Sequence, residues 1–177
     1  MKPQVTLTCR EGTQLTVDED IKDMCLLIKD IVEDAGVEEE IPLAQVSQKY
    51  LEAIIEYCEH FKFKKLKTDI PHPLPSNKPQ QFIKDPWELH FVQKMTLDDT
   101  IELLQAANYM NIPSIFELCC AVIAAEFKGK NFDEIKKQYG LEDLSYTPAD
   151  EEEIKKLYPW IITETEQKIK KLKNEFA

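Results

Sequence analysis

The sequence predicts an α+β protein, in which a small N-terminal sheet is followed by helices that continue to the end of the chain. Three observations lead to this class. Apolar and polar residues alternate within the first twenty positions, which is the period of a half-buried strand. Apolar residues then recur at spacings of three and four, which line one face of an α-helix. Several of these helical segments also begin with residues that cap a helix.

The N-terminus predicts a β-hairpin followed by one helix. Apolar residues alternate with polar ones over residues 5–9 and again over 15–17, on either side of a Glu-Gly turn. Acidic residues 18–20 then stand where the positive end of a helix dipole favours negative charge. We expect a single amphipathic helix from there to Ala35, because the helical spacing continues until Gly36.

A short strand and a second helix are expected next. Pro42 cannot donate to an inner ladder, so the strand at 41–43 is expected at the edge of the sheet. Ser47 is a suitable helix cap, and apolar residues follow it at helical spacing as far as Phe61.

Residues 62–84 interrupt this regular pattern. The segment contains four prolines, has no apolar period and is locally basic. These features are typical of a long, solvated loop. A docking patch or a targeting signal is the alternative interpretation of its lysines. Aromatic and apolar residues resume from Trp87, at the entry to a further helix.

Two helices joined by a short corner dominate the region 96–130. Thr96 and Asp99 fit a capping box at the start of the first helix. Pro113 suits the first position of the second helix, because its fixed φ is helical and its missing N–H would be unpaired there. This second helix is apolar over more than half its circumference and ends near Gly129, so something must cover it.

The C-terminal region is also predicted to be helical. Asn131 with Glu134 resembles a capping box, and Thr147 with Asp150 resembles another. The second of these helices is expected to end at about Leu157, because a proline follows two residues later. Residues 161–177 show helical spacing once more.

Composition limits the classes of function. The 177 residues carry a net charge of −11, which argues against nucleic acid as a partner, since such binding needs clustered Lys and Arg. The five cysteines are odd in number, show no C-x-x-C spacing and fall at apolar positions, as expected of free thiols in a reducing compartment. No apolar run approaches membrane-spanning length. We therefore expect a soluble protein in the cytoplasm and nucleus.

Motifs for catalysis and cofactor binding are missing from the sequence. It has no glycine-rich phosphate loop, and its three histidines are scattered rather than spaced as metal ligands. Carboxylate pairs stand at helix starts, where capping explains them. We expect no catalytic residue, no metal, no cofactor and no small-molecule substrate.

Two runs of residues carry a more specific resemblance. L-L-x-A-A-N-Y-M-x-I begins at Leu103, and F-K-G-K-x-x-x-E-I-K-K begins at Phe127. Together they resemble the Skp family, the adaptor subunits of SCF (Skp–cullin–F-box) ubiquitin ligases, over Val5 to about Trp160. The resemblance implies a BTB/POZ fold with a small three-stranded sheet and a C-terminal helical extension. It also implies the following division: N-terminal BTB/POZ region 1–61, flexible loop 62–84, remaining BTB/POZ helices 85–127, dimerisation and F-box-binding helices 113–160, and an added helical tail 161–177.

The resemblance also implies two partner sites. Asn108 and Tyr109 match the cullin-contacting pair of the family, although an Asn-Tyr pair at a helix end is equally typical of a cap. F-box contacts are implied on the C-terminal helices, where the alternative for each residue is a place in the core. They are Ile115, Phe116, Cys120, Ile123, Phe127, Ile135, Leu157 and Trp160.

Two functions follow as hypotheses. The first is a non-catalytic adaptor that links a cullin scaffold to F-box substrate receptors, and that forms a homodimer when no F-box protein is present. The alternative is a self-assembling BTB/POZ homodimer with a structural role and no part in a ligase.

Overall fold

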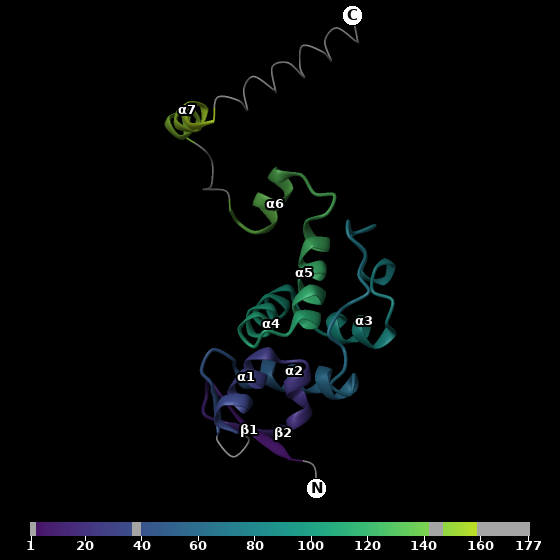
Figure 1. The fold of residues 1–177 in the computed structure, drawn as a ribbon. Coiled ribbons are helices and arrows are strands. Elements are labelled where there is room, and N and C mark those ends of the chain that lie inside the picture. Colours follow the sequence, from purple (N-terminus) through teal and green to yellow (C-terminus); the bar gives the residue numbers. More distant parts are fainter. Residues whose placement is uncertain (1–2, 37–39, 142–146, 159–177) are drawn as a thin grey trace, which may run out of the picture. The chain divides into compact units, whose positions relative to one another are not determined.

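The computed structural model describes residues 3–36, 40–141 and 147–158 (Figure 1). The chain divides into two compact units, Met1–Gly129 and Lys130–Ala177. The first unit holds a three-stranded sheet, its helices and the main hydrophobic core. The described residues of the second unit hold two helices. The predicted α+β class is confirmed.

The sheet has the strand order β2-β1-β3, with the elements β1 Gln4–Cys9, β2 Gln14–Asp18 and β3 Ile41–Leu43. β1 pairs antiparallel with β2, so that Val5 faces Val17, and parallel with β3, so that Leu7 faces Ile41. These four side chains are buried. β3 lies at the edge with Pro42 exposed, as the missing N–H of proline predicts.

The prediction of one continuous helix from residue 18 to Ala35 is wrong, because the segment is interrupted. It is two elements, the 3-10 helix η1 Glu19–Asp23 and α1 Leu26–Ala35. Cys25 between them is extended, and its Sγ donates to the Met110 oxygen at 2.9 Å. The N–H groups of Leu26 and Leu27 also donate, at 3.3 Å each, to carbonyl oxygens of Asn111 and Met110. Bonds to a distant region of the chain therefore replace the bonds of a continuous helix.

Four further α-helices belong to the described residues of the first unit: α2 Gln48–His60, α3 Pro86–Gln93, α4 Leu97–Tyr109 and α5 Pro113–Phe127. α4 packs against α2 and α5. The Thr96–Asp99 capping box of α4 and the N-terminal proline of α5 are confirmed. At α2 the Ser47 side chain makes no capping bond; instead the Glu11 carboxylate accepts from the N–H of Gln48 at 2.9 Å.

Residues 62–84 are irregular apart from the short 3-10 helix η2 Pro79–Gln81, but they are not a free tether. Figure 1 shows this segment on the side of α5 that faces away from α4. Phe63, Ile70, Phe82 and Ile83 are buried in the core. The prediction of a solvated loop is therefore wrong at these four positions. Their apolar side chains gain free energy by burial against the helices.

The second unit contains α6 Phe132–Gln138 and α7 Pro148–Leu157. Both predicted capping boxes are present, Asn131 with Glu134 and Thr147 with Asp150. The end of α7 at Leu157 agrees with the prediction. The expected helix at 161–177 and the Trp160 site lie outside the described residues.

Candidate protein-interaction site

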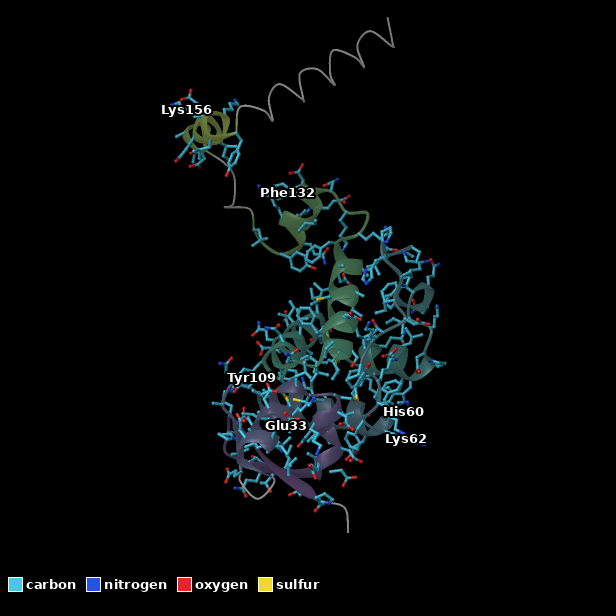
Figure 2. All side chains as sticks on the ribbon, viewed as in Figure 1. Glu33, His60, Lys62, Tyr109, Phe132 and Lys156 are labelled. Atoms are coloured by element: carbon cyan, nitrogen blue, oxygen red, sulfur yellow. The ribbon has the colours of Figure 1, made fainter. Side chains whose placement is uncertain are left out.

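The corner between α4 and α5 forms one half of the candidate site. Asn108 is exposed and Tyr109 half-buried at the end of α4, where Figure 2 labels Tyr109. The next turn holds Asn111 at φ +54°, a left-handed conformation that Asn tolerates better than most residues. The bonds from the start of α1 to the carbonyls of Met110 and Asn111 hold this turn in place. The polar pair therefore stands on a fixed corner.

An apolar stripe along α5 forms the other half. Phe116, Cys120, Ile123 and Phe127 follow one another at spacings of four, three and four, which places them on one face of the helix. Phe116 is 37% exposed and Phe127 38%, while Cys120 and Ile123 are half-buried. We call these four residues the α5 stripe. Apolar and aromatic side chains that are accessible along one helix face are typical of a surface that binds another protein.

Ile115 does not belong to this surface. It was expected as an F-box contact, but its side chain is fully buried in the core of the first unit. The correction has a simple geometric reason. Neighbouring positions on a helix point about 100° apart, so Phe116 can face outward while Ile115 faces the core.

The corner and the α5 stripe meet at Phe116. A shallow cavity of about 210 Å³ lies between the end of α4 and the start of α5, and its walls include Asn108, Asn111 and Phe116. A residue expected to contact cullin and a residue expected to contact an F-box thus line the same cavity. The two predicted partner sites of the first unit adjoin.

The second unit presents apolar residues of its own. Leu157 is 64% exposed on α7, and Ile135 is half-buried on α6. Phe132, labelled in Figure 2, is 62% exposed at the first position of α6 and was not among the expected contacts. An aromatic residue directly after a helix cap, outside the apolar stripe, is the sequence signal that could have identified it.

Four of the five thiols are unsuited to nucleophilic chemistry. Burial raises the pKa of both Cys25 and Cys119 to about 12, and it raises the pKa of Cys58 as well. The half-buried Cys120 also has a raised pKa, again through burial. A thiol needs its thiolate form to react, so these groups are inert near neutral pH. Among the described residues, no group of three or more His, Cys, Asp or Glu is arranged to hold a metal ion.

The helices of the described residues include none with the length and apolar character to cross a membrane. A small α+β unit with an exposed apolar helix face and a fixed polar corner has the features of a protein-interaction module. The order of its strands and helices agrees with the BTB/POZ fold that the sequence resemblance implies. Comparison with known families assigns it more closely. Residues 3–63 match the tetramerisation domain of the Skp1 family, and residues 113–161 match its dimerisation domain.

Relatives cover nearly the whole chain. The S-phase kinase-associated protein 1 homolog of Tetrahymena thermophila is 33% identical over 157 residues, which are 89% of this chain and 93% of the relative. The E3 ubiquitin ligase complex SCF subunit sconC of Aspergillus clavatus is 32% identical over 161 residues, 90% of this chain and 98% of the relative. The same subunit of Arthroderma benhamiae is 30% identical over 158 residues, 89% of this chain and 94% of the relative. The chain belongs to the Skp1 family.

Proposed function

We propose that this protein is a non-catalytic adaptor of an SCF-type E3 ubiquitin ligase, joining a cullin scaffold to F-box substrate receptors. One observation carries the proposal within this family. The polar corner at Asn108 and the α5 stripe meet in one cavity at Phe116, so one rigid unit offers two adjoining surfaces of different chemistry.

The F-box side of the adaptor is the apolar one. The α5 stripe offers an exposed apolar face of the kind that receives an amphipathic helix. Phe116 and Phe127 are its large exposed side chains, and Cys120 and Ile123 lie between them. The second unit adds its own apolar residues, for which the family resemblance supports the same role: Ile135, Leu157 and Trp160.

The cullin side is the corner, with Asn108 and Tyr109 as the contacting pair. The bonds that tie the corner to α1 limit its movement, and a pre-organised surface loses less conformational entropy on binding. Catalysis of ubiquitin transfer belongs to other subunits of the assembly. The five free cysteines, four of them buried, support a reducing compartment, the cytoplasm and nucleus.

In the absence of an F-box protein, a second copy of the chain covers the apolar face, which gives the homodimer. A homodimer with a purely structural role is the less favoured function. Both Skp1 family domains are matched, and the relatives from Aspergillus clavatus and Arthroderma benhamiae are named as SCF subunits.

The test is binding of a purified F-box domain to the wild-type chain and to Phe116→Glu, measured by calorimetric titration. A charge placed in the centre of an apolar interface should weaken the affinity at least thirty-fold, about 2 kcal/mol. Leu66→Glu is the matched control, because Leu66 is an exposed apolar residue outside the α5 stripe. Equal affinities for the two variants would remove the α5 stripe from the F-box site.

A further inference from the structure

Thr68 fastens the irregular segment 62–84 to α5. Its hydroxyl donates to Glu117 Oε2 at 2.8 Å, and its backbone N–H donates to the same oxygen at 3.3 Å. Glu117 follows Phe116 on α5, so this contact joins the segment to the helix that carries the α5 stripe. One carboxylate oxygen thus accepts two donors from a single residue.

The residues around Thr68 are basic and accessible. Lysines precede it at 62, 64, 65 and 67, and Figure 2 labels the first of them. Leu66, Lys67 and Asp69 are exposed, and the backbone from 65 to 71 belongs to no helix or strand. Protein kinases that recognise basic residues before the acceptor bind such a segment in extended form, with charge patterns setting their preference.

We propose that Thr68 is a phosphorylation site for a basophilic serine/threonine kinase, and that the phosphate detaches residues 66–69 from α5. In this reaction Thr68 Oγ1 bonds to the γ-phosphorus of ATP, the phosphorus–oxygen bond to ADP breaks, and the hydroxyl proton passes to the base of the kinase. The proposal does not depend on the adaptor function.

The consequence follows from charge. Phosphorylation removes the hydroxyl donor and places a charge of about −1.5 to −2 beside the Glu117 carboxylate, which it repels. Lys64 and Lys67 attract the phosphate, but they lie on the same segment and remain near it whether or not the segment is attached. Lys84, which pairs with Asp69 at 3.2 Å, belongs to the far end of the same irregular region. Glu117 is the charged group of α5 that Thr68 contacts directly, so the interaction between the phosphate and α5 is repulsive.

Lys65 limits the region that detaches. Its ammonium pairs with the buried Glu88 of α3 at 2.8 Å, and this pair is independent of Thr68. We therefore expect the release to begin after Lys65 and to end before the buried Ile70, which leaves the core in place.

The experiment uses the full chain, MgATP and the catalytic domains of protein kinase A and protein kinase C, with a peptide of residues 60–72 as the positive control. Mass spectrometry should find one phosphate at Thr68. Lys64→Ala with Lys67→Ala should slow its addition at least ten-fold. No phosphate at Thr68 of the folded chain, or none on the peptide, would overturn the proposal.

Hydrogen exchange of the amides of residues 66–69 measures the detachment. Phosphorylation should accelerate their exchange at least ten-fold, and the effect should shrink in Glu117→Gln, where the repelling charge is gone. Thr68→Val removes only the hydroxyl donor and should accelerate exchange less than three-fold. A phosphate at Thr68 that leaves exchange unchanged, or that acts equally in Glu117→Gln, would contradict the mechanism.

Discussion

The ion pair between Lys65 and Glu88 gives the sharpest stability prediction. Lys65 Nζ lies 2.8 Å from Glu88 Oε1, and the two side chains are only 19% and 5% exposed. Tyr57 donates its hydroxyl to the same oxygen at 2.6 Å. At this distance and an effective dielectric of about 20, the Coulomb attraction is about 6 kcal/mol, which desolvation partly offsets. Lys65→Met leaves the buried carboxylate without its cation and should cost about 3–5 kcal/mol.

Urea unfolding followed by tryptophan fluorescence measures this loss, since Trp87 packs 5.1 Å from Phe91 and 5.9 Å from Tyr57, centroid to centroid. Adding Glu88→Gln to Lys65→Met should restore more than half of the stability that Lys65→Met loses, because the new side-chain amide is neutral and its oxygen still accepts from the Tyr57 hydroxyl. Lys49→Met is the matched control. It breaks a pair with Asp99 in which the lysine is largely exposed, so its effect should be small. Equal losses in the two lysine variants would show that the burial of the Lys65–Glu88 pair does not raise its contribution to stability.

Three further results are expected. Asn111→Val should destabilise the fold by about 1–2 kcal/mol in urea unfolding while Asn111→Gly should not, because the site has φ +54°; equal stabilities would contradict this. The Cys119 pKa of about 12 lies above its usual 9.0, so folding favours the neutral thiol. The contribution of this thiol to the free energy of unfolding is complete below pH 9 and is lost as the pH rises toward 12. The stability of Cys119→Ala should therefore fall less than that of the wild type over this range; parallel stability–pH curves for the two proteins would contradict this. Asn108→Lys with Tyr109→Lys should weaken cullin binding at least ten-fold and leave F-box binding unchanged in calorimetry; unchanged cullin affinity would reject the assignment.

Local chemistry explains what could be predicted from the sequence. The three capping boxes, the N-terminal proline of α5 and the edge position of Pro42 each depend on residues a few positions apart. The break at Cys25 could not be predicted, because its cause is a set of acceptors at Met110 and Asn111, far along the chain. A periodic pattern shows that a helix can form but not that a distant carbonyl will interrupt it.

The candidate site could also be predicted only in part from the sequence. The resemblance located the corner and α5, and it implied the residues of the α5 stripe. It could not separate Ile115 from Phe116, because a helix that is apolar on most of its surface does not reveal which face the core covers. The packed segment 62–84 was missed for a related reason. Ile70 and the adjacent pair Phe82 and Ile83 stand among prolines and polar residues without a regular spacing, so no period predicts their burial.

The proposed adaptor function requires that one chain binds a cullin and an F-box protein at the same time, through the adjoining surfaces that meet at Phe116. Light scattering on a size-exclusion column tests it directly, with the chain, the N-terminal region of a cullin and an F-box domain mixed in equal amounts. We expect a single species with the mass of one copy of each. Two binary complexes that exclude one another, or a homodimer that binds neither partner, would contradict it.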